Sequence, residues 1–186
     1  MRRAASAGRR AAAMTAYSGI FCGLSVCVML LGGVIPVATY AAPLLASVFL
    51  VPLRDEFGRP CAWTCWGAVT LLALLLGLDR EAALFYAFTG FWPVVREDLN
   101  ARVRPGPARF ILKTGIFVLM IGAMYSLLCL VLRVDAVVSE FGEMETVMTG
   151  AFLVLLCLCL HLYDRVLGFI ALQYRKKLRP KLPMIR

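Results

Sequence analysis

The stretch Ala82–Arg109, AALFYAFTGFWPVVREDLNARVRPGPAR, decides which fold the rest of the chain adopts. It is apolar as far as Val95, with Gly90 and Pro93 near the end of the apolar part, and four arginines follow. The apolar part makes about 21 Å of helix at ~1.5 Å per residue, against roughly 30 Å of hydrocarbon in a bilayer. Its length therefore leaves a re-entrant or half-spanning helix open. The glycine and proline predict that this helix is broken near the arginines.

Composition places the stretch in a membrane protein. Of the 186 residues, 61% are hydrophobic and only 17% are charged, and the mean hydropathy is +0.82. A soluble domain is typically about half apolar, because polar side chains must cover its surface. We therefore expect an all-α, polytopic bundle of about six transmembrane helices, formed by residues 1–186 as a single transmembrane domain. The expected spans are approximately 12–34, 37–53, 61–78, 82–95, 110–132 and 145–163, followed by a basic tail at 175–186.

Charge favours crossing by all six segments, because Lys and Arg are retained on the cytoplasmic side. With the N-terminus inside, 18 of the 20 basic residues lie on the cytoplasmic side, and only Arg80 and Arg133 lie outside. The outer loops then hold six of the eleven acidic residues, which are Asp79, Glu81, Asp135, Glu140, Glu143 and Glu145. If segment 82–95 did not cross, the arginine loop and the basic tail would both lie outside. We predict a multi-pass protein of the cell membrane with the N-terminus and the C-terminus in the cytoplasm.

The first span carries a stripe of small residues, Ala12, Ala16, Gly19 and Gly23. Spacings of four, three and four place them on one helical face, and small residues four apart let helix backbones approach closely. Two interpretations stay open, a docking face for another membrane protein and close packing within this bundle.

The sequence contains little that indicates catalysis. It has no G-x-S-x-G, H-E-x2-H or glycine-rich phosphate motif, so we expect a non-enzymatic protein without cofactor. The seven cysteines lie in apolar surroundings at C-x3-C and C-x-C spacings, which favours small apolar residues over a metal site. His161 and Asp164, three residues apart, permit a proton relay or an interfacial ion pair. The net charge of +9 comes from basic residues that stand beside apolar segments. There they indicate topology and contact lipid headgroups, so we expect no nucleic-acid partner.

The outer ends of the spans are where a solute would be captured. The acidic outer loops attract cations or positively charged solutes, unless they are only the reverse of the positive-inside bias. Headgroup anchoring is the alternative role for each candidate side chain. Chosen by depth alone, the candidates are Tyr40, Arg80, Tyr86, Tyr125, Arg133 and Glu145.

Together these features resemble the substrate-binding (S) components of energy-coupling factor transporters. The resemblance lies in six short helices, cytoplasmic ends, the small-residue stripe and the external rim. Residues 43–59 (PLLASVFLVPLRDEFGR) with the Leu-rich third span look like the second-to-third helix region of that family. Residues 90–98 (GFWPVVRED) are similar to a Gly-aromatic-aromatic-Pro motif of uncharacterised small membrane proteins from Gram-positive bacteria.

The resemblance implies a solute, usually a vitamin or a metal ion, captured from outside by one subunit of an ATP-driven importer. It also implies a membrane scaffold subunit and two cytoplasmic ATPases as partners. The docking motif of the family maps onto Ala12, Ala16, Gly19 and Gly23, although glycines stand here where alanines are typical. The position of His161 near the inner side disfavours nickel or cobalt as the cargo.

The leading expectation is therefore a non-enzymatic solute-binding membrane subunit of an ATP-driven importer, and two other functions are its alternatives. A solute-binding subunit predicts an external cavity with converging polar groups. A structural or assembly protein that binds partners without a solute predicts a filled bundle and an exposed small-residue groove. An enzyme acting on lipids predicts a polar cluster at one interface, for which His161 and Asp164 are the candidates.

Overall fold

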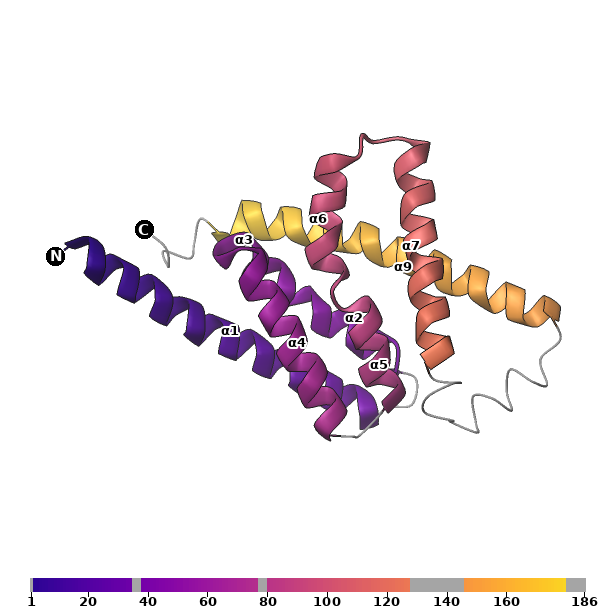
Figure 1. The fold of residues 1–186 in the computed structure, drawn as a ribbon, viewed down its shortest axis with the longest axis horizontal. Helices are drawn as coiled ribbons and strands as arrows, with labels where there is room; N and C mark the ends of the chain where they lie inside the picture. Colours follow the sequence, from indigo (N-terminus) through magenta and orange to yellow (C-terminus); the bar gives the residue numbers. More distant parts are fainter. Residues whose placement is uncertain (1, 35–37, 77–79, 128–145, 180–186) are drawn as a thin grey trace. The chain divides into compact units, whose positions relative to one another are not determined.

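The computed structural model describes residues 2–34, 38–76, 80–127 and 146–179 (Figure 1). Its helices are α1 (Arg2–Val34), α2 (Ala41–Val48), α3 (Leu50–Phe57), α4 (Arg59–Leu76), α5 (Arg80–Thr89), α6 (Trp92–Arg102), α7 (Pro107–Leu127) and α9 (Thr146–Gln173). A π-helical turn, Tyr174–Leu178, continues α9. The described residues include no strand, and the predicted all-α class is confirmed.

Four stretches of these helices are long and apolar enough to cross a bilayer, namely Arg10–Gly33, Arg59–Leu76, Pro107–Leu127 and Leu153–Lys177. Large apolar side chains are exposed along them, as expected for helices whose solvent is lipid. The chain is therefore a helical membrane protein. The predicted spans 12–34, 61–78, 110–132 and 145–163 each fall on one of these helices, as far as the described residues extend.

The predicted span 37–53 is built from two short helices, α2 and α3, that meet at Phe49. Pro52 has no N–H with which to bond the carbonyl of Val48, so the ladder of helical hydrogen bonds is interrupted there. At the junction of the two helices, the Phe49 N–H donates to the carbonyl of Ala46, three residues earlier, at 3.4 Å. The helical region also runs beyond the predicted end, as far as Phe57.

The predicted span 82–95 is likewise divided, into α5 and α6, at the expected glycine and proline. The Gly90 N–H donates to the carbonyl of Tyr86 at 2.7 Å, and Pro93 has no N–H for the carbonyl of Thr89. A Cβ at Gly90 would lie 2.9 Å from the Tyr86 ring, so only glycine fits this turn without displacing that ring. The predicted break is confirmed, and the helical region extends to Arg102.

The described chain forms two compact units. Unit 1 comprises Met1–Asp98 and Leu167–Arg186, and unit 2 comprises Leu99–Val166. The prediction of a single membrane domain concerns how the whole chain folds and stays a prediction.

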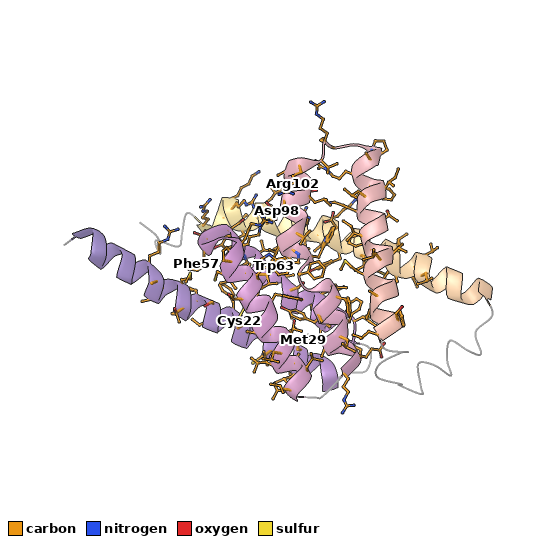
Figure 2. The ribbon with its side chains drawn as sticks, in the orientation of Figure 1. Cys22, Met29, Phe57, Trp63, Asp98 and Arg102 are labelled. Carbon is orange, nitrogen blue, oxygen red and sulfur yellow. A yellow bond between two sulfur atoms is a disulfide. The ribbon has the colours of Figure 1, made fainter. Side chains whose placement is uncertain are left out.

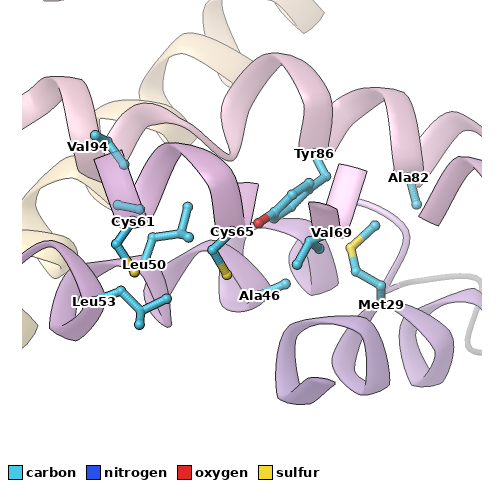
Figure 3. Close-up of a cluster of buried hydrophobic side chains, with 11 residues drawn as sticks. Met29, Ala46, Leu50, Leu53, Cys61, Cys65, Val69, Ala82, Tyr86 and Val94 are labelled. Carbon is cyan, nitrogen blue, oxygen red and sulfur yellow. The ribbon is translucent and has the colours of Figure 1, made fainter. Parts of the chain in front are cut away.

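In unit 1, α4 lies between α1 and α5, and α2 also packs against α1 and α5 (Figure 1). The core between these helices is filled by side chains from every one of them. Figure 3 shows its members, among them Met29 of α1, Leu50 of α3, Val69 of α4 and Tyr86 of α5. Leu50, Val69 and Tyr86 are completely buried. Because lipid is as apolar as these side chains, close packing rather than exclusion of water holds the core together.

Polar contacts mark the two ends of unit 1. At one end the Tyr40 hydroxyl donates a hydrogen bond to the carboxylate of Glu81. At the other end Arg54, where α3 finishes, pairs with Asp98 of α6 at 2.8 Å. Figure 2 shows Phe57 and Asp98 toward this second end and Met29 toward the first.

These contacts give the direction of each helix in unit 1. The pairs α2–α3 and α5–α6 both run from the Tyr40–Glu81 end to the Arg54–Asp98 end, and α4 runs back between them. The 18 residues of α4 cover about 27 Å, close to the thickness of a hydrocarbon core. Segment 82–95 therefore runs alongside a full-length span, which supports the prediction that it crosses the membrane.

In unit 2, α7 and the first part of α9 are joined by polar contacts between apolar surfaces. The Lys113 ammonium pairs with the Asp164 carboxylate at 2.6 Å, and both side chains are about nine-tenths buried. One helical turn away, Thr114 Oγ1 lies 2.9 Å from His161 Nε2. These pairs place the N-terminal part of α7 against residues 161–164 of α9.

Candidate functional site

The small-residue stripe of α1 is an exposed face. Ala12, Ala16, Gly19 and Gly23 are all exposed in the described structure. A Cβ built at Gly19 or Gly23 would meet no heavy atom of the described neighbouring side chains or helices within 4 Å. Within the described part of unit 1 no helix packs closely against this face, and both interpretations of the stripe stay predictions.

A second stripe on α1 packs against the rest of unit 1, and sequence reasoning missed it. It consists of Cys22, Ser25, Met29 and Gly32, spaced three, four and three. The Ser25 hydroxyl, fully buried, contacts the carbonyl of Ala46 in α2 at 3.0 Å. A Cβ at Gly32 would overlap the Cβ of Ala42 in α2.

This packed stripe also brings α1 against α4. A disulfide links Cys22 to Cys65 of α4, and the two Cα atoms are 6.0 Å apart. The two cysteines are 43 residues apart, and no motif has this spacing, so the sequence did not predict that they are linked. The two stripes therefore follow one another along the helix on different faces, the first bare and the second covered.

The predicted solute-contacting residues are only partly brought together. In unit 1, Tyr40 bonds Glu81 and its ring packs edge-on against Phe85, with ring centroids 5.3 Å apart. Arg80 is exposed beside Glu81, whereas Tyr86 is fully buried in the core. Tyr125 is half-buried in unit 2. Arg133 and Glu145 lie outside the described residues.

An ion-pair cluster at the other end of unit 1 joins three segments that lie far apart in the sequence. We call it the inner cluster, because the sequence predicts that its segments lie in the cytoplasm. Arg54 and Arg59 both contact Asp98, at 2.8 and 2.6 Å. Arg175, in the π-helical turn after α9, contacts Asp55 at 2.7 Å and Glu97 at 2.8 Å.

Two further contacts extend the inner cluster along the end of α9. Arg179 pairs with Glu56 at 3.1 Å, and the Tyr174 hydroxyl lies 3.4 Å from the same carboxylate. The sequence placed all these segments on the cytoplasmic side but did not predict their pairing. One pattern pointed to it, namely that the segments expected in the cytoplasm contain five acids among many basic residues. All five are ion-paired, and they are Asp55, Glu56, Glu97, Asp98 and Asp164.

The predicted pair His161 and Asp164 is divided between two partners on α7. Asp164 pairs with Lys113, not with the adjacent Arg165, and His161 contacts Thr114. The His161 ring also stacks on Phe110 with centroids 4.4 Å apart. Through these contacts both side chains link α7 to α9. The proton relay stays a prediction.

Among the residues that the structure describes, no group of three or more His, Cys, Asp or Glu side chains is placed to hold a metal ion. The chain matches no protein-family model, no curated protein and no solved structure.

Proposed function

We propose that the protein is a non-enzymatic, multi-pass membrane subunit that docks on another membrane protein through the face Ala12–Ala16–Gly19–Gly23 of α1. The observation that carries this proposal is the contrast in packing along α1. The stripe has the spacing that favours close helix contact, yet in the described structure it is exposed. A membrane helix with such a face gains van der Waals contact when a second helix covers it.

The interior of unit 1 supports a partner-binding role. Its core is filled by side chains such as Leu50, Leu53 and Phe85, each at most 1% exposed. The filled core and the bare small-residue face together are the pair of features expected of an assembly protein.

The inner cluster supports the proposed orientation. It gathers residues 54–59, 96–98 and 174–179, all expected in the cytoplasm. With these segments inside, Tyr40 and Glu81 lie at the outer end. The proposed location is a cell membrane with both chain ends in the cytoplasm.

A solute-binding subunit of an ATP-driven importer is the second candidate, and the contact between Tyr40 and Glu81 favours it. It places a phenol, a carboxylate and the neighbouring Arg80 at the proposed outer end, where a solute would enter. In that case the partner on α1 is the membrane scaffold subunit that also carries two cytoplasmic ATPases. Mass spectrometry of small molecules retained by the purified protein tests this candidate, and it fails if none is retained.

The docking proposal is tested by site-specific photo-cross-linking in the native membrane. A photoreactive residue at Gly19 should give one defined adduct with a different membrane protein. The variant Gly19→Leu/Gly23→Leu, with the photoreactive residue moved to Ala16, should lose that adduct, because leucine side chains keep the helices apart.

The matched control is Gly115→Leu/Gly122→Leu in α7, which changes two exposed glycines that likewise meet no neighbour. This control should keep the adduct. An adduct between two copies of this chain, or no adduct from Gly19 at all, contradicts the proposal.

A further inference from the structure

Unit 2 contains an apolar groove between α7 and α9 with a volume of about 480 Å³. Its walls are formed by Val118 and Ile121 of α7 and by Leu153, Val154 and Leu158 of α9. The volume lies in the range of roughly 300–1,000 Å³ that is typical of ligand sites. The groove is separate from the α1 face and does not depend on the function proposed above.

The lining of this groove selects a hydrocarbon ligand. Both walls belong to helices long and apolar enough to cross the bilayer, which places the groove at the depth of the hydrocarbon core. A polar solute would find few hydrogen-bond partners among these side chains, which makes its burial costly. From Phe110 to Ile121 the groove follows about 17 Å of α7, a length close to half of the ~30 Å hydrocarbon core. This is the reach of an acyl chain within one leaflet.

One end of the groove is polar and fixed by contacts between the helices. There Thr114 Oγ1 lies 2.9 Å from His161 Nε2, and Phe110 stacks on the His161 ring. Directly beyond it, Lys113 and Asp164 compensate each other's charge at 2.6 Å. This end therefore has a defined shape, but its polar atoms bond one another and the surface of the groove itself is apolar.

Positive charge continues past the polar end. Arg165 is exposed and stands four residues after His161, on the same face of α9. Arg109, next to Phe110, donates to the carbonyls of Asn100 at 2.9 Å and Val103. These bonds close the turn between α6 and α7, whose arginines Arg102 and Arg104 are exposed. In the described part of unit 2 the only acid is Asp164, which Lys113 already compensates.

We propose that this groove binds one acyl chain of an anionic phospholipid from the surrounding membrane, with the headgroup beside Arg165 and the turn 102–109. The apolar walls accept the chain, and the excess of arginine at the polar end selects a negative headgroup. Basic residues near a membrane surface attract anionic lipids in this way. Arg165 stands within the apolar stretch of α9, and its long side chain extends toward the headgroups. The leaflet is the one that faces the arginine-rich turn.

Native mass spectrometry of the purified full-length protein tests this assignment. The protein is placed in mixed micelles that contain phosphatidylglycerol or phosphatidylcholine with identical acyl chains. We expect one phosphatidylglycerol to stay bound under conditions that remove phosphatidylcholine. The variant Val154→Trp, which fills the groove, should lose at least about tenfold in lipid affinity, equal to one step of 1.4 kcal/mol.

Two matched controls separate the groove from the lipid-exposed surface in general. Leu155→Trp alters an exposed neighbour of Val154 that does not line the groove, and it should bind lipid as the wild type does. Arg165→Gln should weaken phosphatidylglycerol binding about fivefold, in line with the contribution of one basic residue at a membrane surface. Arg80→Gln, an exposed arginine of unit 1, should leave binding unchanged.

Three outcomes would overturn the proposal. Equal retention of the two lipids would remove the headgroup assignment. Equal loss in Val154→Trp and Leu155→Trp would remove the groove. Displacement of the lipid by inorganic phosphate alone would show a simple anion site. Circular dichroism of each variant shows that the helices are kept, so that a loss of binding is not a loss of fold.

Discussion

Two stripes of α1 have almost the same spacing and opposite surroundings. Ala12, Ala16, Gly19 and Gly23 form the exposed stripe, and Cys22, Ser25, Met29 and Gly32 form the packed one. Both repeat at intervals of three and four residues, so each forms a continuous face. The difference teaches that such spacing predicts a face suited to helix packing but not the neighbour that covers it. That neighbour can be a helix of the same chain, as α2 and α4 are for the packed stripe, or a helix of another protein.

The largest expected effect comes from Gly32→Leu. Because a Cβ at this position already overlaps Ala42, a leucine must push α1 away from α2. We expect the free energy of unfolding to fall by about 3 kcal/mol, the upper end of the usual cost of overpacking. Titration of the purified protein with SDS in detergent micelles measures this loss. A variant as stable as the wild type would show that α1 and α2 do not meet at Gly32.

Ser25→Ala sharpens the comparison with a smaller change. The buried Ser25 hydroxyl lies 3.0 Å from the carbonyl of Ala46, a link between α1 and α2, and 2.9 Å from the carbonyl of Phe21 in its own helix. Its removal should lower the free energy of unfolding by about 1 kcal/mol, the typical net value of a buried hydrogen bond. The control is Ser18→Ala, because the Ser18 hydroxyl bonds only the carbonyl of Thr15 at an exposed site. Equal losses in the two variants would contradict the difference between the faces.

The smallest effect on stability is expected for Gly23→Leu, the same substitution as in Gly32→Leu but on the exposed stripe. Here the new side chain meets open space, and leucine is a better helix former than glycine by up to about 1 kcal/mol. The free energy of unfolding, measured by the same titration, should be unchanged or slightly raised. A loss as large as that of Gly32→Leu would mean that the exposed stripe is covered within the folded chain.

Several local features of the fold were readable from single residues. Gly90 and Pro93 predicted the break between α5 and α6, because proline removes a backbone donor and glycine accepts the close approach of Tyr86. The division between α2 and α3 follows from Pro52 in the same way, but the apolar run around it was read as one span. In both places the helical regions extend beyond the predicted apolar limits, because charged residues continue a helix at its end.

The side-chain partners were less predictable. Lys113 and Asp164 are 51 residues apart, and Arg175 and Asp55 are 120 apart. No local period relates such positions. The distribution of charge indicated only that the segments expected in the cytoplasm contain acidic residues among many basic ones. Which acid pairs with which base depends on how the helix ends meet in space.

By itself the sequence determined that this is a helical membrane protein, where its apolar segments lie, and which residues of α1 form a small-residue face. These properties follow from local hydropathy, residue size and helical period. Only the tertiary structure decided that Gly32 is covered while Gly23 is bare, that Asp164 belongs to Lys113, and that a groove opens between α7 and α9. Each of these depends on contacts between segments distant in the chain, which helical periodicity does not encode.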